Sequence, residues 1–415
     1  MCFYSVSPFF CKKEENTMKI IGKQNEAIVY GNTIEDSAIE QIQMLCDQVF
    51  IKHSKIRIMP DVHTGAGCTI GMTMTISDKV VPNIVGVDIG CGMYTVCLGK
   101  IEIDFEKLDA VVHTIPSGKN VWEGKQKQFD LTVLNCYRSL KDTKRIMRSI
   151  GTLGGGNHFI EIEKTKDNVK YMVIHTGSRN LGKQVANYYQ DMAIDLQKGK
   201  EEYFQKKEQM IAQYKAEGRR KELQKALKEI TWIPKELEMP EDLCFLYGKY
   251  MQQYLQDIEI CQQFAVQNRE LIAQKIIEGM NWKVEEAFHT IHNYIDVEEN
   301  IVRKGAISAK KGEKVLIPIN MKEGSILAIG KGNEEWNYSA PHGAGRLFSR
   351  SQAKECFTLE QYQKEMEGIY TTCVTEKTLD ESPMAYKKLE DIINAVQQTV
   401  DVVEVMKPMY NFKAE

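Results

Sequence analysis

The segment Val85-Gly-Val-Asp-Ile-Gly-Cys-Gly-Met-Tyr-Thr-Val-Cys-Leu98 joins a glycine-rich turn to a run of apolar and β-branched residues. The run from Met93 onward predicts a strand. The turn before it places Asp88 and Cys91 three residues apart across a glycine, so one tight turn can direct both side chains at the same point. Carboxylates and thiolates bind metal ions, and a thiolate has enough lone pairs to bridge two of them. Taken alone, the motif is more often a buried structural cysteine.

The same combination of short strands and glycine-rich turns recurs along the chain. Strands are predicted at 69–76, 169–175, 315–320 and 325–330, and helices at 34–52 and 105–113. This mixture predicts an α+β fold in which central sheets carry the active-site loops. We expect one catalytic domain over residues 18–415.

Two stretches have a helical pattern. Residues 184–280 are rich in Gln, Glu, Lys, Tyr and Leu and poor in Gly, which predicts long helices broken near Trp232 and Pro240. We expect this stretch to be a helical insertion within the catalytic domain. Its Lys/Arg cluster from 215 to 228 is a candidate RNA contact, although a solvated helical face balanced by glutamates is the simpler interpretation. A helical tail is predicted over 359–405.

Composition narrows the class of protein. The 415-residue chain is 43% hydrophobic and 27% charged with a formal net charge of −3, so any nucleic-acid contact must come from a local patch. Its 11 cysteines contain no CxxC pair, which favours reduced thiols in a cytoplasmic protein over a disulfide framework. No apolar run is long enough for a membrane span.

Residues 1–17 differ in character from the rest, and we expect them to be disordered or a start-site extension.

Three histidines accompany the Asp88 and Cys91 pair. His158, His175 and His292 are each flanked by Gly, Asn or Ser and stand where strand patterning ends. Together the five residues would furnish one or two metal sites. The affinity order favours zinc, while Mn²⁺, Co²⁺ and Fe²⁺ are also compatible with these ligands, so the residues leave the metal open.

The motif Pro341-His-Gly-Ala-Gly-Arg346 places a histidine on a glycine turn beside an arginine. Imidazole is a good nucleophile and, once phosphorylated, a good leaving group, while the arginine fork matches phosphate oxygens. His342 is therefore a candidate nucleophile toward phosphorus, with metal ligation as the competing role. The glycine run at 154–156 is a further candidate for phosphate binding through backbone N–H groups, but it lacks the Lys-[Ser/Thr] of a P-loop.

Seven ordered motifs make the chain resemble the RtcB family of RNA ligases. They are Met59-Pro-Asp-Val-His-Thr-Gly65, Val85 to Met93, Gly151-Thr-Leu-Gly-Gly-Gly-Asn-His-Phe-Ile-Glu161, His175-Thr-Gly-Ser-Arg179, His292-Asn-Tyr294, Arg303-Lys-Gly-Ala306 and His342 to Arg346. The resemblance runs from about Met18 to the C-terminus. It implies a cytoplasmic enzyme that uses GTP and Mn²⁺ to join an RNA 3′-phosphate or 2′,3′-cyclic phosphate to a 5′-hydroxyl, in tRNA splicing or RNA repair. An archease-like activator would be a further partner.

The resemblance also implies roles for individual residues. Two manganese ions would be bound by Asp88, Cys91, His158, His175 and His292, with Cys91 bridging. His342 would be the catalytic nucleophile that takes GMP through a phosphoramidate bond. The guanylate would contact Asn157, His158, Phe159, Ile160, Glu161, His292, Asn293, Pro318, Asn320, Met321, Ser325, His342, Gly343, Ala344, Gly345 and Lys413. Asp61, Arg179 and Arg346 would complete the active site.

The chain departs from the family pattern at two places. Where the family often has Pro-Gly-Ser-Met, this chain has Pro318-Ile-Asn-Met321, and the larger isoleucine can close space beside a nucleotide. The family's Lys-Gly ending is Lys413-Ala-Glu415 here. Two other functions are compatible with the motifs: a metal-dependent phosphoesterase acting on RNA 3′-phosphate or cyclic phosphate ends without ligation, and a non-enzymatic RNA-end binding protein.

Overall fold

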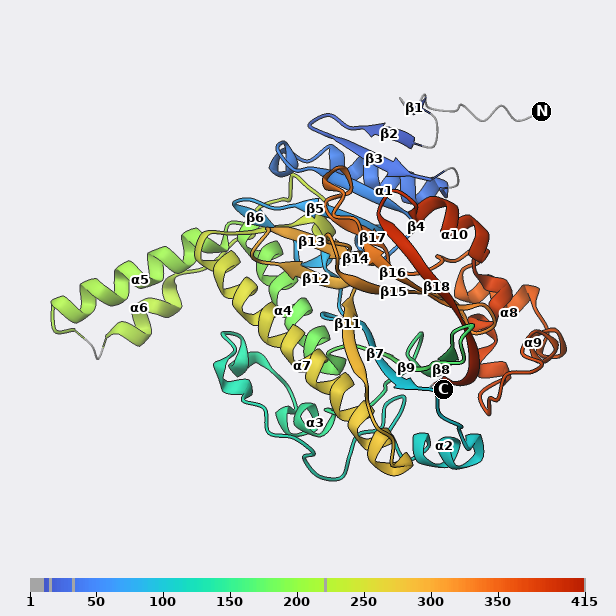
Figure 1. The fold of residues 1–415 in the computed structure, drawn as a ribbon. Coiled ribbons are helices and arrows are strands. Elements are labelled where there is room, and N and C mark those ends of the chain that lie inside the picture. The colour runs from blue at the N-terminus through green and yellow to red at the C-terminus, as the bar shows by residue number, and fades with distance from the viewer. Residues whose placement is uncertain (1–10, 15–16, 32–33, 220–221, 414–415) are drawn as a thin grey trace.

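The computed structural model describes residues 11–14, 17–31, 34–219 and 222–413, and two seven-stranded sheets dominate it (Figure 1). The first sheet has the order β1-β2-β3-β4-β5-β13-β12. Only β3 and β4 run parallel among its neighbours. Its strands are β1 (Cys11–Glu14), β2 (Thr17–Ile21), β3 (Glu26–Tyr30), β4 (Ile56–His63), β5 (Ile70–Thr75), β13 (Ile301–Lys304) and β12 (Asn293–Asp296).

The second sheet is antiparallel throughout and has the order β11-β7-β9-β8-β18-β16-β15. Its strands are β11 (Glu286–Ile291), β7 (Gly92–Gly99), β9 (Lys170–Thr176), β8 (Phe159–Lys164), β18 (Val400–Lys413), β16 (Gly324–Gly330) and β15 (Lys314–Asn320). Two short pairs complete the strands: β10 (Leu246–Tyr247) with β6 (Lys79–Val80), and β14 (Ala306–Ser308) with β17 (Ser339–Pro341).

Helices cover these sheets and connect them. The longest, α7 (Gly248–Met280), runs beside α4 (Arg179–Gln197) and contacts β7, β9 and β12, so one helix links both sheets (Figure 1). The others are α1 (Asp36–Cys46), α2 (Phe105–Val112), α3 (Thr143–Arg148), α5 (Lys200–Ala216), α6 (Leu223–Glu229), α8 (Arg350–Cys356), α9 (Leu359–Glu365) and α10 (Leu389–Val396). Short 3-10 turns lie at 49–51, 82–84, 131–133, 137–139, 241–243, 334–336, 376–381 and 383–385.

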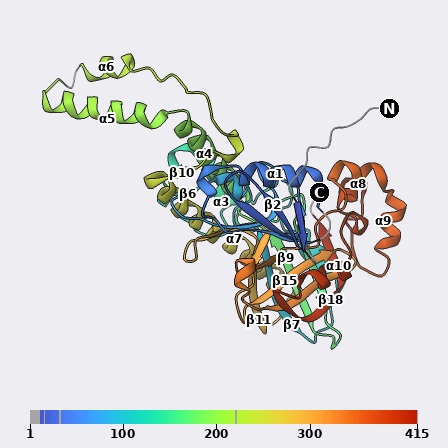
Figure 2. The same cartoon turned by 90° about the horizontal axis from the view of Figure 1, so that it is seen from above.

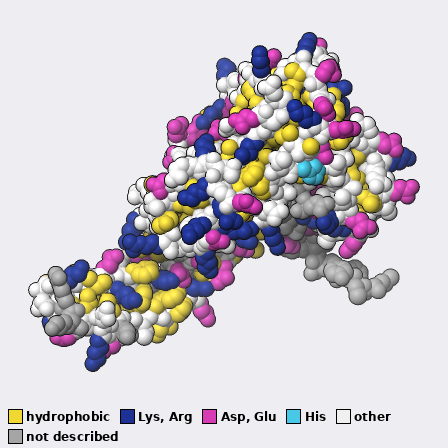
Figure 3. All heavy atoms as spheres, turned by 90° about the horizontal axis from the view of Figure 1, so that it is seen from below, with side chains coloured by type: hydrophobic (Ala, Val, Ile, Leu, Met, Phe, Trp, Pro, Cys, Tyr) yellow, Lys and Arg dark blue, Asp and Glu magenta, His cyan; other side chains and the backbone are white. Residues whose placement is uncertain are grey.

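The region 184–280 is helical as predicted, but the structure divides it into two parts. Helices α4 and α7 contribute buried residues to the main core, whereas α5 and α6 project away from the body as an arm (Figure 2). The main-chain N–H of Lys235 donates to the carbonyl of Lys198 at 3.0 Å, which closes the arm at its base. Lys and Arg side chains stand on the arm and on the adjoining body (Figure 3). The arm is therefore smaller than the predicted insertion.

Most other predicted elements are confirmed, and the α+β class with them. The predicted strands at 69–76, 169–175, 315–320 and 325–330 correspond to β5, β9, β15 and β16. The helical tail predicted over 359–405 is confirmed only at α9 and α10. The residues between these helices form turns and short 3-10 segments, and Val400–Lys413 form the long strand β18 between β8 and β16. The prediction for residues 1–17 falls mostly outside the described residues. Within the described part of the chain, no helix is both long and apolar enough to cross a membrane.

Candidate active site

The turn before β7 positions a carboxylate and a thiol side by side. Asp88 and Cys91 lie between the 3-10 turn at 82–84 and β7, and the backbone of the turn is fixed by a hydrogen bond from Gly90 N to the carbonyl of Asn293 at 2.6 Å. The loop after β9 packs against this turn so closely that a Cβ on Gly177 would lie 2.2 Å from Asp88 Oδ1. Glycine at 177 is thus required for the two loops to meet.

Two histidines, one before β8 and one in the neighbouring strand β9, lie beside the Asp88 and Cys91 pair. His158 immediately precedes β8 and His175 lies near the end of β9. Their Nδ1 atoms lie 2.8 Å from the Leu153 carbonyl and 3.1 Å from the Asn157 carbonyl. A carbonyl only accepts, so each Nδ1 carries the hydrogen and each Nε2 presents a lone pair. His158 Nε2 lies 3.6 Å and His175 Nε2 3.3 Å from Cys91 Sγ.

The ligand atoms form two groups that share one thiol. Asp88, Cys91 and His158 make one group, and Cys91, His175 and His292 make the other, with the ligand atoms of each group within 4.8 Å of one another. His175 Nε2 and His292 Nε2 are 3.0 Å apart, and His158 Nε2 is 3.0 Å from Asp88 Oδ2. His158 Nε2 and Asp88 Oδ2 both present lone pairs, which repel one another at this distance unless a cation lies between them. The donor set therefore fits metal binding, with Cys91 common to both groups.

Burial sets the charge state of these ligands. It lowers the pKa of His175 and of His292 well below the ordinary value, which keeps both rings neutral and able to bind a metal. Burial and the Asp88 carboxylate raise the pKa of the Cys91 thiol well above its usual range, so the thiolate needs a cation beside it.

Two arginines, the buried Arg269 and the half-buried Arg179, support the loops around the ligand groups. Arg269 of α7 is 0% exposed and donates from Nη1 to the carbonyls of Gly90 and Thr176, both at 2.7 Å. Arg179, at the start of α4, donates from Nη2 to the Gly118 carbonyl at 3.0 Å. Both side chains therefore hold segments of the backbone in place. Arg269 lies in the middle of an amphipathic helix, where no local motif distinguishes it.

His342 is oriented by a buried carboxylate from the other sheet. Asp61 of β4 is 0% exposed, and its Oδ2 lies 2.6 Å from His342 Nδ1 and 3.1 Å from the backbone N of His342. A Cβ on Gly345 would lie 2.7 Å from the Asp61 carbonyl oxygen, so glycine is needed for this approach. The Asp61 carboxylate accepts a hydrogen bond from the Nδ1–H group of His342, so the Nε2 atom of the ring keeps its lone pair. The His342 ring lies 4.8 Å from the His292 ring, beside the metal-ligand groups.

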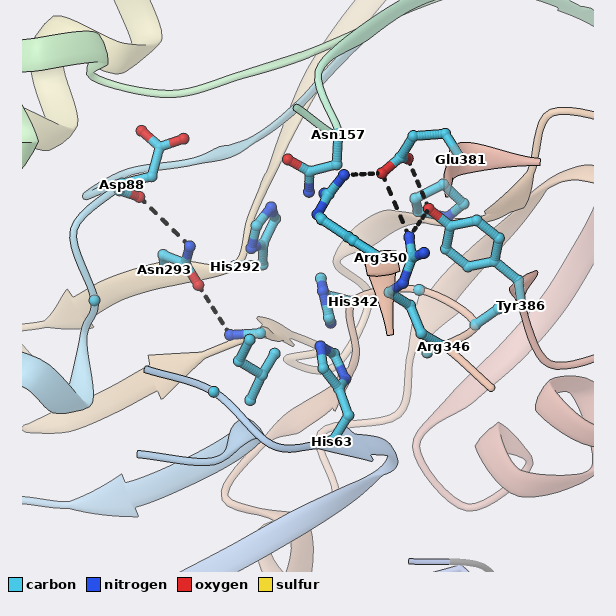
Figure 4. Close-up of a pocket in the computed structure, with 18 of the residues that line it drawn as sticks. His63, Asp88, Asn157, His292, Asn293, His342, Arg346, Arg350, Glu381 and Tyr386 are labelled. Carbon is cyan, nitrogen blue, oxygen red and sulfur yellow. Dashed lines mark hydrogen bonds and ion pairs between the residues drawn. The ribbon is translucent and has the colours of Figure 1, made fainter. Parts of the chain in front are cut away.

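A cavity of about 710 Å³ opens beside His342. Figure 4 shows side chains around it, including His63 and Asn293 from the first sheet and Asn157, His292 and His342 from loops. Its lining includes most of the expected guanylate contacts: Asn157, Phe159, Glu161, His292, Asn293, Pro318, Asn320, Met321, His342, Gly343, Ala344, Gly345 and Lys413. The volume is in the range of small-molecule sites.

Three expected guanylate contacts are absent from the cavity lining: His158, which belongs to the ligand groups, Ile160 and Ser325. Ile160 is 0% exposed and packs into the apolar core on the opposite face of β8, because neighbouring residues of a strand face opposite sides. Ser325 is buried behind the cavity wall and donates to Glu163 at 2.7 Å. Ile319, the departure from the family pattern, lines the cavity, but it is only 2% exposed and packs with Ile317 and Ile326 in a core cluster. The isoleucine is thus accommodated largely by the core.

A cluster of charges forms one cavity wall, and it joins the predicted Arg346 and Lys413 to Glu381, which was not predicted. Glu381 accepts from the Tyr386 hydroxyl at 2.7 Å and pairs with Lys413, Arg346 and Arg350 (Figure 4). Burial alone would raise the pKa of Glu381, but the neighbouring Lys413 and Arg350 cations hold it at about 2. The ionised carboxylate fixes these three cations at the cavity wall. Glu381 has no motif around it, so only the fold shows its position.

Known proteins resemble this chain over nearly its whole length. The family described as tRNA-splicing ligase RtcB matches residues 41–139 and 132–414. The chain is 29% identical to the RNA-splicing ligase RtcB of Escherichia coli (strain K12), over 91% of this chain and 94% of that protein. It is 26% identical to the tRNA-splicing ligase RtcB of Aeropyrum pernix, over 88% and 90% of the two chains.

Proposed function

Because the chain belongs to the RtcB family and is an RNA ligase, we propose that it joins an RNA 3′-phosphate or 2′,3′-cyclic phosphate to a 5′-hydroxyl with GTP and two Mn²⁺ ions. One observation carries this proposal. His342 has its Nδ1 fixed on Asp61, so its Nε2 is left to react at a cavity of nucleotide size. A histidine held in this way suits nucleophilic attack on phosphorus.

The metal ions have an assigned place in this proposal. Asp88, Cys91 and His158 would hold one, and Cys91, His175 and His292 the other. When bound, the ions supply positive charge that offsets the charge of phosphoryl oxygens.

The reaction proceeds in three steps. His342 Nε2 attacks the α-phosphorus of GTP, a phosphorus–nitrogen bond forms, and pyrophosphate leaves. The RNA 3′-phosphate oxygen then attacks the same phosphorus, which frees His342 and leaves GMP on the RNA end. Finally the 5′-hydroxyl of the second RNA attacks the activated 3′-phosphate and GMP leaves. A cyclic phosphate is first opened to the 3′-phosphate by water.

The cavity residues have separate roles. Glu381 holds the cations Arg346 and Lys413 in the cavity wall. Cations of this kind bind phosphate oxygens. Glu161 and Asn157 also line the cavity and would contact the nucleotide. Arg179 and Asp61 act through the backbone and the His342 ring that they fix.

The cellular setting is part of the same proposal. We assign the reaction to the cytoplasm, where thiols such as the buried and unpaired Cys46, Cys136 and Cys261 stay reduced. The RNA substrate would be a pair of tRNA halves or another cleaved RNA, and an archease-like protein would act as activator.

Labelling with α-³²P-GTP and Mn²⁺ tests this function. The wild type should become covalently labelled, the label should be acid-labile, and His342→Ala should take none. His53→Ala is the matched control, because His53 is an exposed histidine away from the cavity. If the metal-loaded wild type takes no label from GTP or ATP, nucleotidyl transfer is wrong. Hydrolysis of RNA ends that survives in His342→Ala would then identify a phosphoesterase.

A further inference from the structure

Lys304 is a buried cation that lines the cavity. It ends β13 and is 5% exposed. Its ammonium group donates to the carbonyl of Ala66 at 2.8 Å and to the carbonyl of Asn83 at 3.0 Å. An ammonium group has three hydrogens, so one donor of Lys304 is left over. A buried charge is costly unless an opposite charge lies beside it.

The acids on this side of the cavity do not supply that opposite charge. Among the described residues, no carboxylate forms an ion pair with Lys304. Asp242 lines the same part of the cavity, but it is exposed and its Oδ1 accepts from Asn83 Nδ2 at 3.1 Å. Glu35 is exposed as well, and it accepts from the backbone N–H of Thr64 at 2.6 Å. Burial therefore lowers the pKa of Lys304 in spite of Asp242, and a bound anion would oppose this effect.

The chain next to Lys304 passes close to His342. Gly305 has a φ of +62°, and a Cβ at this position would lie 3.1 Å from His342 Cε1 and 2.3 Å from Ile70 Cγ2. Glycine is thus needed for the backbone to approach the ring. The N–H of Gly305 donates to Asn293 Oδ1 at 2.9 Å, which fixes the segment. Lys304 is therefore held one residue away from the contact with the reacting imidazole.

A second imidazole lies at the same place. His63 ends β4 and pairs with Ile70 of β5, the residue that packs against Gly305. Its ring lines the cavity beside His342 (Figure 4). His63 Nδ1 lies 3.0 Å from the carbonyl of Asp61, so Nδ1 carries the hydrogen and Nε2 keeps a lone pair. Burial lowers the pKa of His63, which keeps the ring neutral and able to accept a hydrogen.

We propose that Lys304 and His63 form a subsite for a terminal phosphate group, separate from the α-phosphate that His342 takes. The inference rests on the proposed function and deepens it. A terminal phosphate has a second ionisable hydrogen with a pKa of about 6, whereas the diester between two nucleotides has none. Lys304 donates a charge-assisted hydrogen bond to such a group, and His63 Nε2 accepts the hydrogen of its monoanion.

Two groups in the proposed reaction have this chemistry, the γ-phosphate of GTP and the 3′-phosphate of the RNA. Displacement at phosphorus is in line. Pyrophosphate therefore leaves from the side opposite His342 Nε2, and the RNA 3′-phosphate later attacks from that same side. One subsite can serve both groups in turn, because they are never present in the same step.

Equilibrium binding to the metal-loaded protein tests the subsite and separates the two sources. The first comparison is between one oligoribonucleotide with a 3′-phosphate and the same one with a 3′-hydroxyl. The second is between GTP and GMP, measured in His342→Ala so that no covalent bond forms. Lys304→Met should reduce at least one of these two preferences about tenfold or more, and His63→Ala should reduce the same one. The preference that falls identifies the phosphate group that binds.

Lys387→Met is the matched control. Lys387 is half-buried and donates to the carbonyl of Pro60 at 2.8 Å, but it does not line the cavity. Its replacement removes a lysine that holds backbone and should leave both preferences unchanged. The inference is overturned if both preferences survive in Lys304→Met, or if Lys387→Met loses them equally. Should Lys304→Met not fold, an unchanged His63→Ala overturns it.

The outcome is independent of the labelling reaction. A wild type that takes no label from GTP overturns the proposed function. The two binding comparisons need no turnover, so they still decide whether Lys304 and His63 bind a terminal phosphate.

Discussion

Replacing Asp61 with asparagine should slow formation of the His342–GMP bond. Asp61 Oδ2 accepts from the His342 ring at 2.6 Å and from its backbone N–H at 3.1 Å, and no solvent reaches the side chain. Asparagine keeps the shape but loses the charge that holds the hydrogen on Nδ1. A hydrogen bond to a charged group contributes about 1.5–3 kcal/mol. Since 1.36 kcal/mol corresponds to a factor of ten, the labelling rate should fall roughly 10- to 150-fold.

Single-turnover labelling with saturating α-³²P-GTP and Mn²⁺ measures this rate. Asp78→Asn is the matched control, because Asp78 is an exposed carboxylate whose ion pair with Lys79 lies at the surface. Nucleotide affinity and the melting temperature of Asp61→Asn should stay close to wild type, which separates a slow chemical step from poor binding or folding. A labelling rate within twofold of the wild type would refute the orienting role.

Three further predictions concern stability, the arm and the metals. The pKa of Glu381 is held at about 2, below the 4.5 of the unfolded chain, so its ionised form stabilises the fold above about pH 4.5 and this contribution is lost as the pH falls toward 2. Urea unfolding should show Glu381→Gln less stable at pH 7 by on the order of 3 kcal/mol, with a gap that narrows between pH 5 and pH 3; a constant gap would contradict this. Replacing residues 200–231 with a short linker should change the melting temperature by no more than about 2 °C, because α5 buries none of its residues and the base of the arm is already closed; a larger loss would mean that the arm supports the core. Metal analysis should find both ions lost from Cys91→Ala and one retained by His158→Ala, because only Cys91 belongs to both ligand groups; equal losses would argue against the bridge.

The sequence singles out residues whose side chains meet at Cys91 in the structure, for a physical reason. His158 and His175 stand among glycine, asparagine and serine residues that a regular core strand does not require, so their setting is visible locally. The structure then brings their Nε2 atoms within 3.6 Å of Cys91 Sγ. Motifs that close a turn and present a side chain at a strand end are local features, and local features can be recognised without the fold.

The rest of the site depends on distant contacts. Strand β18 was predicted as a helix in its first part, because its stability comes from pairing with β8 and β16 rather than from its own sequence. Glu381 lies in no motif, and its charge state follows from the cations that the fold places beside it. Such residues become visible only when the two sheets are assembled.

The wall of the cavity that β8 and β18 form also carries a consequence for folding. Asn411 and Glu161 meet across β18 and β8 although 250 residues separate them. Pairings of such long range form slowly, since the chain must close a large loop before any contact stabilises it. We therefore expect the cavity to be one of the last parts of the molecule to become complete. A ligand that binds only the complete cavity shifts the folding equilibrium toward the native state by mass action. Nucleotide should therefore reduce misfolding during refolding, because incompletely paired strands are the most prone to misfold.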